Sequence, residues 1–125
     1  MHEELERIAA AVIDEAMWIH KRFGPGLLES VYSALLQRRL RSRGFQVERE
    51  NPMPVEMDGV WFNLGFRADL VINGCFIVEV KSVERLAPVH SKQLLTYLRV
   101  SSLRLGLLLN FGEYLLKNGI RRVAN

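Results

Sequence analysis

The sequence contains little of what marks disulfide-stabilised, zinc-binding or membrane-spanning proteins. Its single cysteine, Cys75, excludes an internal disulfide and any multi-cysteine zinc site. No apolar run approaches the roughly 20 residues needed to cross a bilayer. Residues 1–4 lack the basic and then apolar pattern of a signal peptide. We therefore expect a cytoplasmic protein without a membrane segment.

Repeats, low-complexity tracts and linkers are also lacking, so the 125 residues are expected to form one domain, residues 1–125. The chain is 49% hydrophobic and 25% charged, which is ordinary for a globular protein. A net charge of +3 and a pI near 9.4 permit a polyanionic partner without demanding one.

Two helices are predicted at the start of the chain. Apolar residues recur at helical spacing over 4–22, and Gly24-Pro25-Gly26 then breaks the chain. A second helix is predicted over 28–42, with an apolar face made of Leu28, Val31, Tyr32, Leu35, Leu36 and Leu40. Arginines crowd its last turns, from Arg38 to Arg43, where cations suit the helix dipole. They form either a solvated helix end or a set of phosphate contacts.

The rest of the chain reads mainly as strands. We expect them over 45–50, 53–57, 60–64, 66–72, 75–81, 103–110 and 120–123, with one helix over 89–101. Pro52 and Pro54 confine their region to a sheet edge or a break. The strand over 75–81, the helix and the apolar strand over 103–110 form one β-α-β unit with parallel strands. The predicted fold class is α/β, with a mixed sheet and helices on both faces.

Charged side chains interrupt two of these apolar strands. Asp69 lies in one strand, and Glu79 and Lys81 lie in the next. Burying an unpaired charge in a core costs several kcal/mol, unless the pKa of the group shifts so far that the group becomes neutral. Because this placement is unfavourable, two carboxylates and a lysine in apolar strands indicate a functional site. The simplest such site is a divalent metal ion held beside a cationic group. This is the arrangement of a metal-dependent phosphodiesterase.

The turn between the two strands decides whether the carboxylates meet. A two-residue Asn73-Gly74 loop would pair Asp69 with Val78 and send Glu79 to the opposite face. A three-residue loop over 72–74 would pair Asp69 with Ile77 and make Glu79 its diagonal neighbour. We therefore predict a bulged or widened turn.

Further polar groups come from the predicted helices. His90, Gln93 and Tyr97 are spaced i, i+3 and i+7, so they form one stripe on the helix over 89–101. Glu29 lies in the first turn of the second helix, and Tyr32 follows three residues later.

These motifs resemble those of known nucleases. Asp69-x9-Glu79-x-Lys81 resembles the core signature of the PD-(D/E)XK nuclease superfamily. Gly26-x-x-Glu29-x-x-Tyr32 resembles the motif of the small GxxExxY proteins placed within it. Other strings similar to that family are Ile19-His20-Lys21, Gly24-Pro25-Gly26, Phe66-Arg67-Ala68-Asp69-Leu70, Gln93-Leu94-Leu95-Thr96-Tyr97 and Asn110-Phe111-Gly112. Ala68 stands where the superfamily name has proline, a residue that is not a ligand.

The resemblance implies a restriction-endonuclease-like αβββαβ core with an extra N-terminal helix. It also implies a nuclease that hydrolyses phosphodiester bonds in DNA with Mg²⁺ or Mn²⁺. Asp69, Glu79, the Val80 carbonyl and Glu29 would hold the metal, Glu29 directly or through water. Lys81 would orient the attacking hydroxide or neutralise phosphoryl charge. Gln93 and Tyr97 would hold a phosphate or the attacking water, with His90 and Lys92 as weaker candidates.

Plainer interpretations stand beside these. Asp69 could pair with Arg67 or Lys81, and Tyr32 could serve the core with its hydroxyl satisfied. His20 is expected to be structural, and Trp18 and Trp61 are expected to pack against other residues. Two rival functions follow: a non-catalytic nucleic-acid-binding module with the nuclease fold, and a protein-interaction module, in one form a homodimer.

Overall fold

The computed structural model describes residues 2–63 and 66–125. Three α-helices occur there: α1 (His2–Phe23), α2 (Glu29–Ser42) and α3 (Pro88–Ser101). The strands are β1 (Val47–Pro52), β2 (Val55–Met57), β3 (Val60–Phe62), β4 (Arg67–Ile72), β5 (Phe76–Lys81), β6 (Leu105–Asn110) and β7 (Ile120–Ala124). A short 3₁₀ helix, η1 (Leu116–Gly119), precedes β7. Every predicted element is present, with ends shifted by a few residues. The predicted strand over 60–64 ends at Phe62, and Leu64 lies outside the described residues.

Five strands form one mixed sheet in the order β1-β4-β5-β6-β7. The β5–β6 pair is parallel, because α3 carries the chain back across the sheet between these strands, and the other neighbouring pairs of this sheet are antiparallel. The order α2-β1-β4-β5-α3-β6 is the αβββαβ core that the sequence predicts, and α1 is the extra N-terminal helix. The α/β prediction is confirmed.

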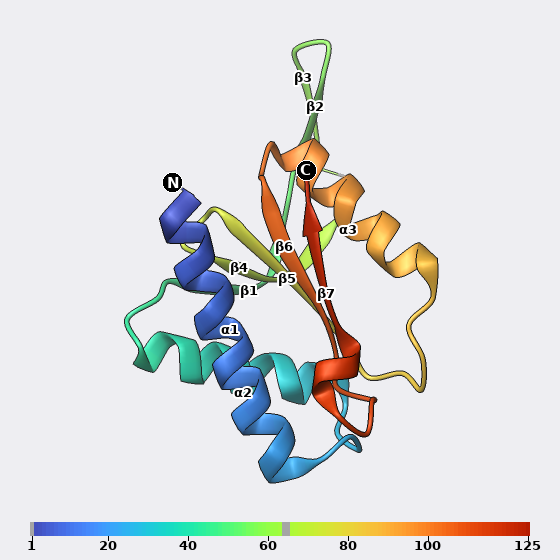
Figure 1. Ribbon diagram of the computed structural model, residues 1–125. Helices are drawn as coiled ribbons and strands as arrows, with labels where there is room; N and C mark the ends of the chain where they lie inside the picture. Colours follow the sequence, from blue (N-terminus) through green and yellow to red (C-terminus); the bar gives the residue numbers. More distant parts are fainter. Residues whose placement is uncertain (1, 64–65) are drawn as a thin grey trace.

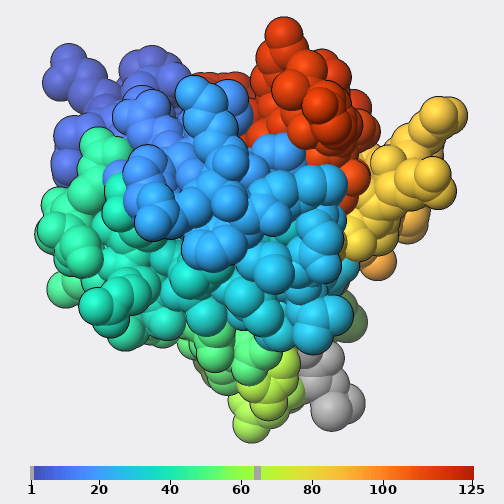
Figure 2. Space-filling model, turned by 90° about the horizontal axis from the view of Figure 1, so that it is seen from below, coloured from blue at the N-terminus to red at the C-terminus, as the bar shows by residue number. Residues whose placement is uncertain are grey.

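Helices cover both faces of the sheet (Figure 1). Helices α1 and α2 pack on one face, against side chains such as Leu70, Val78 and Leu107. Helix α3 packs on the other face, where Leu94 and Leu98 are fully buried. Seen from below, α2 and the segment before it spread across the middle of the molecule (Figure 2). All six residues of β6 are buried, as expected for a strand covered on both sides.

Strands β2 and β3 form a separate antiparallel hairpin between β1 and β4. It projects from the sheet beside the C-terminal end of α3 (Figure 1). The hairpin leaves apolar side chains in solvent, among them Trp61, which is 64% exposed. The prediction that Trp61 packs against other residues is therefore wrong. A two-stranded ribbon with apolar residues on both faces cannot bury all of them.

The turn between β4 and β5 is widened, as predicted, but its register differs from the predicted one. Asn73 and Gly74 both have positive φ (50° and 66°), and the Cys75 N–H donates to the Ile72 carbonyl (3.0 Å). Cys75 is the extra residue, so the strands pair Ile72 with Phe76 and Leu70 with Val78. The expected pairing of Asp69 with Ile77 is wrong. The observed register instead brings Asp69 directly opposite Glu79.

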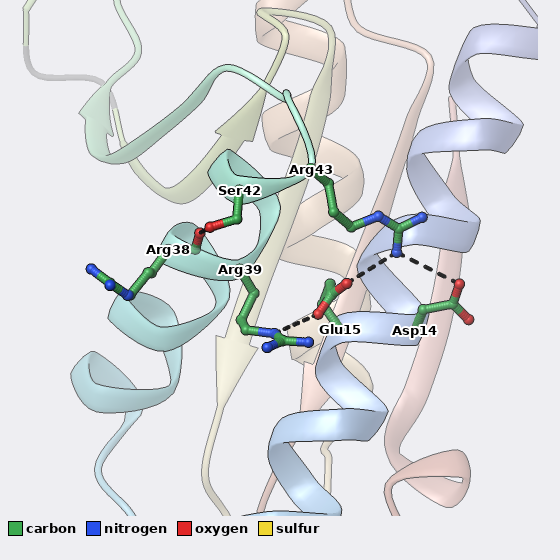
Figure 3. A network of polar contacts seen from close by, with 6 residues as sticks. All are labelled: Asp14, Glu15, Arg38, Arg39, Ser42 and Arg43. Carbon is green, nitrogen blue, oxygen red and sulfur yellow. Dashed lines mark hydrogen bonds and ion pairs between the residues drawn. The ribbon is translucent and has the colours of Figure 1, made fainter.

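The arginines at the end of α2 attach it to α1 (Figure 3). Glu15, a nearly buried carboxylate of α1, accepts from Arg39 Nε (2.7 Å) and from Arg43 (3.1 Å). Arg41 donates to the Val47 carbonyl (2.7 Å). These three guanidinium groups therefore serve the fold, while Arg38 points away from the network (Figure 3).

The apolar face of α2 differs from the predicted one. Leu28 is 73% exposed and Val31 is 39% exposed, so neither belongs to the core. Tyr32 is fully buried and stacks on Phe111, with ring centroids 4.2 Å apart. This long-range contact rotates the helix so that Tyr32, Leu36 and Leu40 face the sheet. Among the described residues, no helix is long and apolar enough to span a membrane.

Candidate active site

The site lies where β4 and β5 stop pairing. Their ladder ends at Leu70 and Val78, and Asp69 and Glu79 come next on the two strands. Side-chain bonds replace the ladder there: the Asp69 N–H donates to Glu79 Oε1 (3.3 Å), and the Val80 N–H donates to Asp69 Oδ2 (2.8 Å). The two carboxylates thus lie between the diverging strands, and each is held by the backbone of the other strand.

Burial and mutual repulsion perturb this pair. Glu79 is only 7% exposed, and burial together with the negative charge of Asp69 raises its pKa to about 8. Burial also raises the pKa of Asp69. The charge of Lys81 opposes both pKa shifts, so this ammonium lies near enough to act on both carboxyls. Ionising the pair is therefore costly unless a further positive charge is present.

Glu29, in the first turn of α2, reaches the segment after β5. Its Oε2 accepts from the Ser82 N–H (3.1 Å), and the Ser82 hydroxyl donates to the Leu27 carbonyl (2.9 Å). Glu29 also lines a pocket of about 220 Å³ together with Asp69. It is thus placed both to hold the chain just beyond Lys81 and to face the first carboxylate of the pair.

Tyr32 closes the turn before α2. Its hydroxyl donates to the Gly24 carbonyl and accepts from the Leu27 N–H (3.0 Å). The prediction of a core tyrosine with a satisfied hydroxyl is confirmed. Tyr32 therefore positions the segment that carries Glu29, without lining the pocket itself.

Asn110 is a site-positioning residue for which the sequence suggested no role. It is fully buried, its Oδ1 accepts from the Val83 N–H (3.0 Å), and its Nδ2 donates to the Val83 carbonyl (2.9 Å). The Phe111 N–H donates to the Lys81 carbonyl (2.8 Å). A Cβ on Gly112 would lie 2.1 Å from the Val83 carbonyl oxygen, so only glycine fits there. The end of β5 is thereby locked onto the end of β6. The sequence did contain one indication of this role, because Asn110 is a single amide residue at the end of an otherwise apolar strand.

The stripe on α3 is only partly directed at the pair. Tyr97 stacks on Phe66, with ring centroids 3.8 Å apart, and its pKa is raised by burial and then by the charges of Glu79 and Asp69. Gln93 is exposed one turn earlier on the same helix. His90 Nδ1 accepts from the Ala87 N–H (3.0 Å) and so caps the start of α3. His20 is likewise structural, as predicted, because its Nε2 bonds the Glu113 carbonyl oxygen (2.8 Å).

Two residues of β1 that the sequence did not suggest as site residues also line this pocket. Arg49 and Glu50 lie there with Asp69, and Arg49 donates to the Ser30 carbonyl (3.3 Å). Glu50 has a positive φ of 54° and stands opposite Asp69 in the register, where the β1–β4 pairing is interrupted. The sequence offered little indication that Arg49 and Glu50 belong to a site, because charged residues on an edge strand are usually solvated.

The donor set suits a hard cation with few protein ligands. Over residues 2–63 and 66–125, no three side chains from His, Cys, Asp and Glu are grouped to hold an ion. The structure offers instead the adjacent carboxylates of Asp69 and Glu79. Mg²⁺ commonly binds through one or two carboxylates and keeps several waters. Such an ion would balance the two adjacent negative charges of Asp69 and Glu79, whose ionisation is otherwise unfavourable.

A family model of the PD-(D/E)XK nuclease superfamily matches residues 6–123. The chain belongs to this superfamily. Comparison with curated proteins and with solved structures found no match. Asp69, Glu79 and Lys81, the residues that the sequence predicts as the superfamily signature, lie on β4 and β5, and Asp69 and Glu79 stand where the two strands stop pairing. Ala68 replaces the proline of the name and is buried where β4 pairs with Asn51 of β1. PD-(D/E)XK nucleases generally depend on divalent metals.

Proposed function

We propose that this protein is a Mg²⁺- or Mn²⁺-dependent nuclease that hydrolyses phosphodiester bonds in DNA, with residues 1–125 as one nuclease-like domain. The observation that carries the proposal is the Asp69–Glu79 pair, a half-buried and a buried carboxyl that face each other beside Lys81. A purely structural role gives no reason to place two carboxyls where Glu79 ionises only near pH 8. A nuclease role explains it, because a divalent metal and a phosphate bring the missing charges.

The chain's own residues have distinct parts in this proposal. Asp69 and Glu79 hold the metal, with the Val80 carbonyl and Glu29 as the further ligands, Glu29 directly or through water. A metal bound by these residues would act as a Lewis acid on the phosphate and would lower the pKa of the attacking water. Lys81 places its ammonium where negative charge gathers on the phosphoryl oxygens. Gln93 and Tyr97, on α3, hold the phosphate.

Glu29 and Tyr32 also support a finer placement. We assign the chain to the GxxExxY group within the superfamily, because both motif residues have definite tasks. Glu29 reaches the pocket and the Ser82 N–H, and Tyr32 closes the Gly24–Leu27 turn that precedes it. The motif thus links the start of α2 to the strand that carries Glu79 and Lys81.

The test combines Mn²⁺ calorimetry with a nuclease panel. Wild type should bind Mn²⁺ and cleave DNA, whereas Asp69→Asn should lose both activities while remaining folded. Glu48→Gln, which removes an exposed carboxylate of β1, is the matched control and should behave as wild type. Mn²⁺ binding that is equal in wild type and Asp69→Asn would refute the proposed ligand set.

The same panel separates the non-catalytic alternative. That alternative is favoured by the hydrogen bonds that the two carboxylates already make to the Asp69 and Val80 N–H groups. A nucleic-acid-binding module would bind DNA equally well in EDTA and would not cleave it with Mn²⁺. A nuclease would cleave DNA with Mn²⁺ and lose cleavage when Asp69 is replaced.

A further inference from the structure

A second pocket lies at the base of the β2–β3 hairpin, beside the C-terminal end of α3. Its volume is about 440 Å³, within the range of small-molecule sites, which is about 300–1,000 Å³. Residues from the hairpin and from the last turn of the helix line it, including Met53, Glu56, Trp61, Arg99, Ser101 and Ser102. The superfamily signature does not include any of these residues.

The chemistry of the pocket suits a flat, uncharged ring with polar edges. Trp61 is 64% exposed and offers an aromatic ring, and Arg99 offers a guanidinium donor. Glu56 is an acceptor, and the Ser102 hydroxyl can donate or accept, whereas the Ser101 hydroxyl donates to the Tyr97 carbonyl and can only accept from a ligand. Glu56 and the carbonyl end of α3 are both negative, so a phosphate group is disfavoured there. A nucleobase satisfies all of these groups, because its ring stacks on tryptophan and its edge carries donors and acceptors.

Tyr97 and Phe66 connect this pocket to the candidate active site through a short series of contacts. The Tyr97 ring stacks on Phe66, and the Phe66 carbonyl accepts from the N–H of Met53, which lines the pocket (2.9 Å). Ser101, also in the lining, donates its hydroxyl to the Tyr97 carbonyl (2.7 Å). Burial, and then the charges of Glu79 and Asp69, raise the pKa of the Tyr97 hydroxyl. On α3, Tyr97 therefore lies about one helical turn before Ser101 of the pocket lining.

We propose that this pocket binds an unpaired base of the substrate strand whose phosphate is cleaved at the Asp69–Glu79 metal site. This inference rests on the proposed nuclease function and makes it more specific. A base in an intact duplex is stacked and paired, so it cannot enter such a pocket without being extruded. The substrate is therefore single-stranded DNA or a frayed end, and the hairpin is the element that selects it.

The fluorescence of Trp61 tests the proposal directly. The chain has two tryptophans, so Trp18→Phe leaves Trp61 as the sole indole. This variant is titrated in EDTA with a 12-nucleotide oligothymidylate, with an abasic oligomer of equal length and with a blunt duplex. We expect oligothymidylate to quench Trp61, and the abasic oligomer and the duplex to leave it unchanged.

Affinity measurements complete the test. Trp61→Ala should weaken oligothymidylate binding about ten-fold, since stacking contributes about that much per base, and Trp61→Phe should keep most of the affinity. Tyr114→Ala, which removes an exposed aromatic ring outside the pocket, is the matched control and should bind as wild type. Equal affinity for the abasic oligomer and oligothymidylate, or no binding of either, would overturn the inference.

Two outcomes keep this inference distinct from the proposed function. If wild type binds Mn²⁺ and cleaves DNA but Trp61→Ala cleaves single strands as well as wild type does, the base pocket is refuted and the nuclease stands. If Trp61 instead mediates self-association, sedimentation should show concentration-dependent dimers that Trp61→Ala abolishes. That result would assign the pocket to a second copy of the chain and overturn base binding.

Discussion

Replacing Glu79 by glutamine should make the metal-free protein more stable at alkaline pH. In the unfolded chain this carboxyl ionises near pH 4.5, whereas burial and the charge of Asp69 raise its folded-state pKa to about 8. The folded protein therefore binds more protons between these two values, and its stability falls as the pH rises through that window. The raised pKa of Asp69 acts in the same direction. Glutamine stays neutral, keeps the shape of the side chain and removes this loss.

The magnitude follows from the width of the window. Each pH unit of difference corresponds to about 1.4 kcal/mol, and the slope fades near each end. Wild type should thus lose about 4 kcal/mol of unfolding free energy between pH 5 and pH 9 relative to Glu79→Gln. The two proteins should be similar near pH 5.

Urea denaturation in EDTA, at several pH values from 5 to 9, measures this difference. Glu48→Gln, on the exposed edge strand, controls for the loss of an ordinary carboxylate and should follow the wild-type pH profile. Parallel pH profiles for wild type and Glu79→Gln would refute the electrostatic account of the pair. Mn²⁺ at 100 times its Kd should restore about 2.7 kcal/mol to wild type at pH 8, since it binds only the folded state.

Two further substitutions test the supports of the site. Asn110→Ala should cost about 2–3 kcal/mol of unfolding free energy, because it leaves the Val83 N–H and carbonyl without their partner, and the exposed Asn118→Ala should cost little. Urea denaturation measures both, and equal effects would contradict the locking role of Asn110. Glu15→Ala should cost about 1–2 kcal/mol, because Arg39 and Arg43 lose a nearly buried acceptor, whereas the exposed Asp14→Ala should be close to neutral. A thermal shift as small for Glu15→Ala as for Asp14→Ala would show that this network does not hold α1 to α2.

Local patterns sufficed for the elements of the fold but not for every face. The apolar strand over 105–110 was predictable, because six consecutive buried residues leave a continuous run. The face of α2 was not, since it depends on Tyr32 stacking against Phe111, a residue far along the chain. Leu28 and Val31 continue the helical apolar pattern in sequence, yet the sheet has no surface for them. Long-range packing therefore decided what periodicity left open.

The candidate site shows the same division. Charge inside apolar strands was enough to select Asp69, Glu79 and Lys81, because such placement costs free energy wherever the strands pack. The roles of Asn110 and Gly112 could not be predicted from the sequence, because both residues contact the backbone of Val83 on a different loop. Backbone acceptors and donors carry no residue identity, so no pattern in the sequence marks them. Supporting contacts of this kind are the least predictable part of a site.

The register of one hairpin connects the fold to the chemistry. In an antiparallel pair, one residue added to a turn changes which side chains share a face. Here Cys75 is that residue, and it sets Leu70 against Val78 and thus Asp69 against Glu79. The strands then diverge at the point where the two carboxylates meet, so the side chains take over the hydrogen bonds of the ladder. A two-residue Asn73-Gly74 turn would instead have placed the two carboxylates on opposite faces, one under α2 and one under α3.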